Sequence, residues 1–95
     1  MKIGHTIKQL IKIQKVKQSY VAKKANICPS YLSKIIHSKS IPSIKTIIKI
    51  CDSLDTSVPV MFALSMDETD IKPENLAKYR LLKPHFINIL IDIIK

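Results

Sequence analysis

The chain has 95 residues, of which 46% are hydrophobic and 24% are charged, which excludes both a disordered chain and a typical enzyme with a deep cleft. Its net charge is +9 and is unevenly placed, because residues 1–51 hold eleven lysines and no acidic residue, whereas residues 52–95 hold five basic and seven acidic residues. A compositional bias toward lysine accounts for part of the lysine count but not for the position of the acids, so the asymmetry predicts a polyanionic partner.

The chain opens with a predicted amphipathic helix over residues 3–14. Apolar residues recur there at helical spacing, and lysines occupy the opposite face. The apolar residues are Ile3, Ile7, Leu10 and Ile11, and the lysines are Lys8, Lys12 and Lys15. A second helix is predicted over residues 18–25, with Val21, Ala22 and Ala25 turned inward. Asn26 suits the left-handed residue of the turn that follows, since asparagine tolerates positive φ.

The third predicted helix follows this turn closely. Cys28 stands at its N-cap position and Pro29 at N1, where the missing N–H of proline costs nothing. The helix continues through Ile36, with Leu32 and Ile35 facing the core. The spacing of the second and third helices predicts two short helices joined by a tight turn.

Two serine caps mark the next two helices. After a loop at residues 38–42, Ser43 caps a fourth helix, and after a turn at residues 55–57, Ser57 caps a fifth helix that ends near Leu64. Pro59 fits the first turn of the fifth helix. The fourth helix carries Ile44, Ile47, Ile48, Cys51 and Leu54, and we expect Cys51 to lie in the core.

The C-terminal third contains more polar residues and two prolines. Residues 66–72 are predicted to form a linker and residues 73–83 a helix that Pro84 breaks. In the final segment, polar residues at i, i+4 and i+7 favour a second helix, although its many β-branched residues leave a strand as the alternative. These polar residues are Asn88, Asp92 and Lys95.

The sequence lacks the residue patterns of metal and catalytic sites. Cys28 and Cys51 fit no metal-ligand spacing, the three histidines are scattered, and no carboxylate pair or nucleophile–base pair is visible. The longest apolar run is far shorter than the roughly 20 residues of a membrane span. We therefore expect a cytoplasmic protein that is not an enzyme, has no cofactor or metal, and does not enter a membrane.

The segment from Gln18 to Lys39 resembles the phage Cro/C1 repressor-like (XRE-type) helix-turn-helix family. The resemblance covers about residues 3–65 and depends on the joint spacing of several positions rather than on any single one. These are Gln18, Ala22, Asn26, Tyr31 to Ile35, and the Pro42-Ser43-x-x-Thr46 start of the fourth helix. It implies an all-α fold, a five-helix lambda-repressor-like DNA-binding bundle over residues 1–65, followed by a C-terminal helical extension over residues 66–95.

The resemblance also implies a DNA-binding surface on double-stranded DNA, with the recognition helix over about residues 28–37. Short side chains at the start of that helix would meet base edges, Lys34 would reach a phosphate or a guanine, and residues on either side would contact the backbone. The candidate residues are Lys17, Gln18, Pro29, Ser30, Tyr31, Ser33, Lys34, His37, Lys39 and Ser40. Two alternatives stay open: the two serines are ordinary solvated residues, and Tyr31 packs against the second helix instead of DNA.

The chain departs from the family pattern at three positions. Lys17 stands where a serine or threonine cap is usual, Ile36 replaces a common acidic residue, and Ser38 replaces a glycine. The recognition helix also lacks arginine, asparagine and glutamine. We therefore expect phosphate contacts, thymine methyl groups and DNA shape to supply much of the specificity.

The last predicted helix is apolar around most of its circumference, which predicts that a second subunit covers it. The proposed homodimer interface consists of Phe86, Ile87, Leu90, Ile91 and Ile94. The alternative is that this helix folds back over its own core. Together these features indicate a homodimeric, sequence-specific transcriptional regulator, most simply a repressor. A second hypothesis is an antitoxin-like module whose C-terminal helices bind a partner protein.

Overall fold

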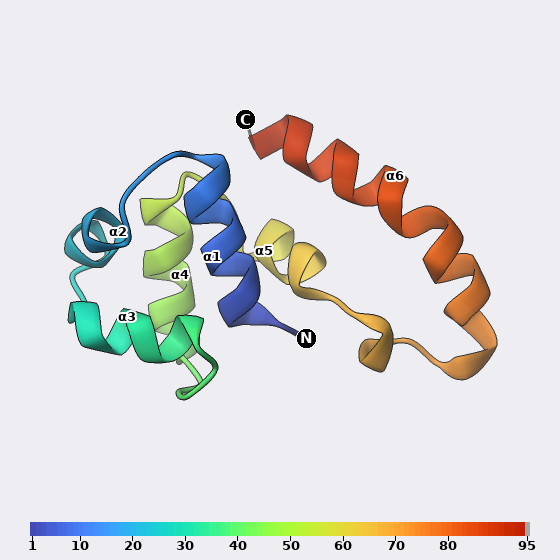
Figure 1. The fold of residues 1–95 in the computed structure, drawn as a ribbon, viewed down its shortest axis with the longest axis horizontal. Coiled ribbons are helices and arrows are strands. Elements are labelled where there is room, and N and C mark those ends of the chain that lie inside the picture. Colours follow the sequence, from blue (N-terminus) through green and yellow to red (C-terminus); the bar gives the residue numbers. More distant parts are fainter. Residues whose placement is uncertain (95) are drawn as a thin grey trace.

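The structure is a computed structural model that describes the backbone of residues 1–94 and the side chains of residues 1–93, and all its regular elements are helical (Figure 1). Residues 1–94 form six α-helices: α1 (Ile3–Ile13), α2 (Gln18–Lys24), α3 (Pro29–Ile36), α4 (Ile44–Ser53), α5 (Val58–Ser65) and α6 (Leu76–Ile94). Two single-turn 3₁₀ helices, η1 (Glu68–Asp70) and η2 (Pro73–Asn75), connect α5 to α6. The predicted all-α bundle of five helices with a C-terminal helical extension is confirmed.

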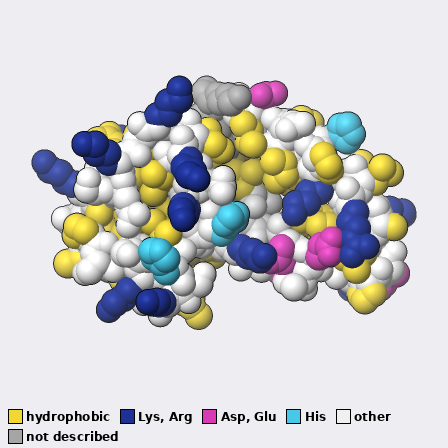
Figure 2. Space-filling model, in the orientation of Figure 1, with side chains coloured by type: hydrophobic (Ala, Val, Ile, Leu, Met, Phe, Trp, Pro, Cys, Tyr) yellow, Lys and Arg dark blue, Asp and Glu magenta, His cyan; other side chains and the backbone are white. Residues whose placement is uncertain are grey.

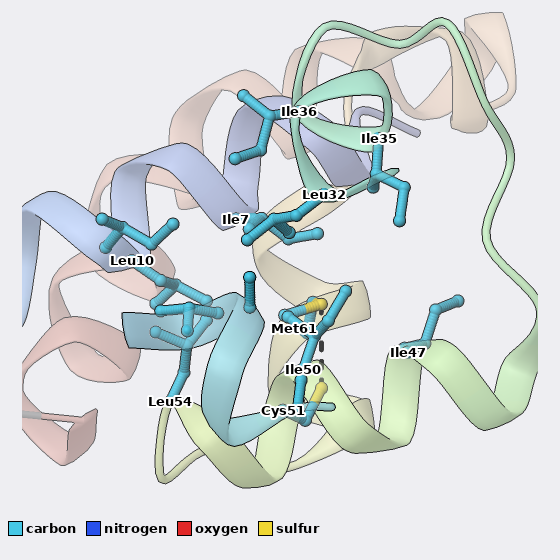
Figure 3. Packing of buried hydrophobic residues seen from close by; sticks show 14 residues of the cluster. Ile7, Leu10, Leu32, Ile35, Ile36, Ile47, Ile50, Cys51, Leu54 and Met61 are labelled. Atoms are coloured by element: carbon cyan, nitrogen blue, oxygen red, sulfur yellow. Dashed lines mark hydrogen bonds between the residues drawn. The ribbon is translucent and has the colours of Figure 1, made fainter. Parts of the chain in front are cut away.

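The hydrophobic core lies inside the bundle of α1 to α5. Every one of these five helices contributes at least one side chain that is fully or almost fully buried, and Figure 3 shows several of them converging. The core includes Ile7, Leu10, Leu32, Ile35, Ile50, Cys51, Leu54 and Met61. Cys51 is buried as predicted, and its thiol lies 3.7 Å from the sulfur of Met61. Not all isoleucines of α4 belong to the core: Ile50 is buried, whereas Ile44 and Ile48 are exposed.

The predicted serine caps are present. The hydroxyl of Ser43 accepts the backbone N–H of Thr46 at 3.2 Å, and the hydroxyl of Ser57 accepts that of Val60 at 3.4 Å. Each bond satisfies one N–H that has no partner inside its helix. Lys17 and Cys28, the N-cap residues of α2 and α3, make no such bond. The lysine that replaces the usual serine or threonine therefore leaves the start of α2 uncapped.

The ends of α1 to α4 share one turn geometry. In each, a residue with positive φ follows the C-cap. Its own N–H and that of the next residue donate to carbonyls of the last turn, which is the Schellman arrangement. The residues with positive φ are Lys15, Asn26, Ser38 and Asp55. The prediction for Asn26 is confirmed, with φ 55°. Ser38 has φ 59°, which explains why the family pattern has glycine at this position.

Gly4, the single glycine, lies inside α1 rather than in a turn. α1 crosses the C-terminal end of α3 at this point, and a Cβ atom added to Gly4 would come within 2.7 Å of the backbone carbonyl oxygen of Ile36 and closer still to that of Ile35. Real Cβ atoms essentially never approach backbone oxygen so closely. The absence of a side chain at Gly4 therefore sets how near α1 lies to α3.

Two predictions for the C-terminal third are wrong in detail. Residues 66–72 are not a plain linker, because the carboxylates of Asp67 and Asp70 accept backbone N–H groups and close the 3₁₀ turn η1. Pro84 does not break the helix: α6 continues through it to Ile94. Proline removes one N–H and crowds the carbonyl four residues earlier, that of Arg80. Both residues are exposed, so water can bind that carbonyl and the helix persists.

We expect the stability of the fold to fall in alkaline solution because of Cys51. Burial raises the pKa of its thiol from 9.0 to about 11, and Asp52 adds a smaller effect in the same direction. Between these values the unfolded chain loses the thiol proton more readily than the folded chain, so this contribution is complete below pH 9 and declines toward pH 11. In urea unfolding, the free energy of unfolding of the wild type should fall by about 2 kcal/mol between about pH 8 and pH 10.5. The Cys51→Ala protein should not show this fall. An identical pH dependence in both proteins would contradict this expectation.

Candidate nucleic-acid interface

A tight turn fixes α3 against α2. The N–H of Asn26 bonds to the carbonyl of Lys23 at 3.1 Å, and the N–H of Ile27 bonds to that of Ala22 at 3.0 Å. Ala22 is completely buried, and its small side chain allows the two helices to approach. The α2–turn–α3 unit is therefore held by backbone hydrogen bonds and a close helix contact, the arrangement that presents a helix to the DNA major groove.

The outer face of α3 is polar and free of acidic groups. Leu32, Ile35 and Ile36 are buried, which determines the side of α3 that points away from the bundle. The residues on the outer side are Pro29, Ser30, Ser33, Lys34 and His37; four of them are exposed and Ser33 is half-buried. Their positions recur at helical spacing, so five of the ten predicted DNA contacts lie together on one face. The two serines leave its first turns sterically open.

Tyr31 lies at the border of this face. It is half-buried and packs against the hydrophobic core. This position matches the packing alternative for Tyr31, while its part in DNA contact stays a prediction. A tyrosine held at the edge of the core gives α3 additional apolar contact without occupying its outer face.

His37 closes the last turn of α3. Its Nδ1 lies 2.8 Å from the carbonyl oxygen of Ser33, and because a carbonyl can only accept, Nδ1 carries the proton. The hydroxyl of Ser33 is also near, at 3.4 Å from the same nitrogen. The contact holds the imidazole against the helix and leaves Nε2 as the ring atom able to meet a partner.

The remaining predicted contacts flank α3. Lys17 and Gln18 are exposed at the start of α2, Lys39 is exposed after α3, and Ser40 is half-buried in the loop that leads to α4. The sequence reasoning did not single out Ile41, in the same loop, whose side chain is 96% exposed. The signal for it was weak, since an isoleucine before a proline looks like an ordinary loop residue. It lies in a hollow at the C-terminal end of α3, together with Gly4 and Ile35.

The lysines of the bundle form no ion pair with the described acidic residues. All salt bridges that the described residues form involve the N-terminal amine of Met1 or the side chain of Arg80, with partners in or next to η1: Asp67, Asp70 and Glu68. The bundle at the left of Figure 2 shows lysine side chains and no acidic ones on this face. The bundle therefore presents a positive surface that internal ion pairs do not neutralise.

The predicted dimer residues lie on α6 in two environments. Ile87 and Ile91 face the bundle and, with Leu10 and Leu64, line a groove of about 350 Å³ between α1 and α6. Leu90 is half-buried, Phe86 is 39% exposed, and the side chain of Ile94 lies outside the described residues. α6 therefore turns one side toward its own bundle and leaves another open to solvent. The assignment of these residues to a dimer interface stays a prediction.

Comparison with known proteins gives one match. A family model described as helix-turn-helix matches residues 7–60, which extend from α1 into α5 and include the whole α2–turn–α3 unit. No curated protein and no solved structure matches the chain. None of the helices in the described residues is both long enough and apolar enough to cross a lipid bilayer.

Proposed function

Because the chain belongs to the Cro/C1-type helix-turn-helix family, we propose that this DNA-binding protein is a sequence-specific transcriptional repressor that acts as a homodimer in the cytoplasm and has no enzymatic activity. The observation that carries the proposal is the outer face of α3, which is polar, free of acids and flanked by lysines that form no ion pair with any described residue. Residues 1–65 bind DNA, and residues 66–95 supply the contact between subunits.

The residues around α3 divide into two roles. At its first turns, Ser30 and Ser33 leave space for the edges of bases, and Lys34 reaches a guanine or a phosphate. On either side, exposed polar residues position the helix through the sugar–phosphate backbone. These are Lys17, Gln18, His37, Lys39 and Ser40.

Direct reading of bases is limited in this protein. α3 has no arginine, asparagine or glutamine, the side chains that make the most specific bidentate contacts with guanine and adenine. Ile41 is exposed beside α3 and suits contact with sugars or thymine methyl groups. Much of the preference for an operator then comes from DNA shape and from how easily the site deforms.

A dimer allows the protein to bind two half-sites of one operator. Two recognition helices about 34 Å apart read positions one helical turn apart on the same side of DNA, so the operator is a pseudo-palindrome. Occupancy of such a site next to a promoter is enough to block transcription and requires no contact with polymerase. This is the reason for proposing repression rather than activation.

A salt titration of DNA binding tests the proposal. If the dimer neutralises six phosphates, the logarithm of the binding constant should fall with the logarithm of salt concentration with a slope of about −5. An electrophoretic mobility shift series with a fragment selected from random DNA measures this slope. Absence of binding at low salt, or a slope near zero, would rule the proposal out.

An antitoxin-like role is the second candidate. The observation in its favour is the apolar surface that α6 leaves exposed, including Leu82 and Ile93, at 60% and 69% exposure. In a module of this kind the C-terminal helices bind a different protein, so a protein that lacks residues 66–95 should still dimerise but lose that partner. In the repressor the same deletion should abolish the dimer, and sedimentation equilibrium of the truncated protein distinguishes the two.

A further inference from the structure

One side of α6 carries an apolar stripe whose side chains all stay more than a third exposed, although its first residue, Leu82, also lines a shallow hollow with Ile71 and Tyr79. The stripe consists of Leu82, Phe86, Ile89 and Ile93, which are 60%, 39%, 59% and 69% exposed. Their spacing of four, three and four residues is the a/d spacing that brings two helices into side-by-side contact. The bundle cannot cover this stripe as well, because α6 already turns Ile87 and Ile91 toward it.

We propose that the stripe pairs with the same stripe of a second copy of the chain and that the two α6 helices run antiparallel. The inference rests on the proposed homodimer and adds the direction of pairing and the residues in contact. It places Phe86 and Ile89 at the centre of the interface and adds Leu82 and Ile93 at its ends. Leu81, although 72% exposed, lies outside the stripe.

The distribution of charge on α6 selects the antiparallel direction. Lys78 and His85 lie beside the stripe in the first half and at the middle of α6, whereas Arg80 pairs with Glu68 and Lys83 lines the groove toward the bundle. Asp92, the one acidic residue of α6, lies beside the stripe in the last turns. A parallel pair would place each basic residue beside its own copy. An antiparallel pair places the basic half of one helix beside the acidic end of the other and also opposes the two helix dipoles.

One polar contact follows from this arrangement. His85 and Asp92 are seven residues apart, so they lie on the same side of the stripe, and both are exposed. If the two-fold axis passes between Phe86 and Ile89, Asp92 comes within about two residues of His85 of the partner subunit along the helix axis. The same axis places Leu82 opposite Ile93 of the partner subunit. Pro84 is on the far side of the helix and does not obstruct the contact.

Disulfide trapping in the full-length protein tests the direction of pairing. Cys28→Ser removes the exposed thiol and leaves a good N-cap residue, and the buried Cys51 stays in place. Leu82→Cys and Ile93→Cys are then introduced separately, one version carrying a tag that changes its mass. In an antiparallel pair residue 82 of one copy lies beside residue 93 of the other, whereas identical positions are about 16 Å apart, too far for a disulfide.

Mild oxidation of the mixed variants should give the cross-linked heterodimer, and neither variant alone should cross-link to itself. Cross-linking of each variant to itself would mean parallel helices, and no cross-linking in folded protein would mean that α6 does not pair; either result overturns the inference. Mobility shifts on the same samples keep the two proposals separate. DNA binding without the 82–93 cross-link rejects the antiparallel pair alone, whereas wild-type protein that does not bind DNA rejects the proposed function.

A matched pair of substitutions tests which face is used. Ile89→Asp places a carboxylate in the stripe, and Leu81→Asp places the same carboxylate on an exposed position outside it. We expect Ile89→Asp to raise the dimer dissociation constant by roughly 100-fold in sedimentation equilibrium and Leu81→Asp to change it less than about threefold. Equal effects of the two substitutions would mean that the stripe is not the interface.

Discussion

Gly4→Ala is expected to lower the free energy of unfolding by about 2–3 kcal/mol, although alanine is the better helix former. In an isolated helix this change stabilises by about 1 kcal/mol. Here the added methyl group would press on the carbonyl oxygens of Ile35 and Ile36, which are backbone atoms and cannot rotate away. Either α1 moves outward and loses its packing on α3, or the end of α3 shifts.

Urea unfolding followed by far-UV circular dichroism measures this loss. His5→Ala is the control, because His5 is the next residue of the same helix, is exposed, and should change stability by no more than about 0.5 kcal/mol. The decisive result is whether Gly4→Ala lowers or raises the free energy of unfolding. A Gly4→Ala protein as stable as the wild type, or more stable, would show that α1 and α3 are not in close contact.

Lys34→Glu is expected to weaken operator binding by about 100-fold. Lys34 is exposed on the outer face of α3, so the substitution both removes a contact and places a negative charge against the DNA. Lys8→Glu changes the net charge by the same amount from an exposed position on α1, outside the predicted contacts. That variant should lose only a few-fold in affinity, through the weaker long-range field.

The effect of Lys34→Glu on the affinity for operator DNA, compared with its effect on the affinity for random DNA, shows which contact Lys34 makes. A lysine that meets a base affects the operator more than random DNA, whereas a lysine that meets a phosphate weakens both and reduces the salt slope by about 1. If the substitutions at Lys34 and Lys8 weaken binding equally, only the overall charge matters, and α3 is not the recognition helix.

The parts of the fold that the sequence predicted correctly depend on local signals. Ser43 and Ser57 cap their helices through hydrogen bonds to residues three positions away, and Asn26 takes positive φ because of its own side chain. Pro29 begins α3 where a missing N–H has no cost. Signals of this kind act within one turn of a helix, so the residues themselves specify them.

The predictions that were wrong or missing concern features that depend on contacts between distant parts of the chain. Pro84 predicts a break from local sterics, but α6 continues because the bundle leaves this part of the helix exposed, so water can bind the affected carbonyl. The close approach at Gly4 depends on the path of α3, thirty residues away in the sequence, and no local pattern indicates it. The exposed stripe of α6 depends in the same way on which side of the helix the bundle occupies.

The four left-handed helix ends have a consequence for how the bundle folds. Positive φ costs roughly 1–2 kcal/mol for residues such as Lys15 and Ser38, which have none of the freedom of glycine. A short fragment that contains one of these turns therefore has little tendency to form it alone. We therefore expect these turns to form together with the packing of the helices on the shared core. On this argument α1 to α5 should unfold in a single cooperative transition.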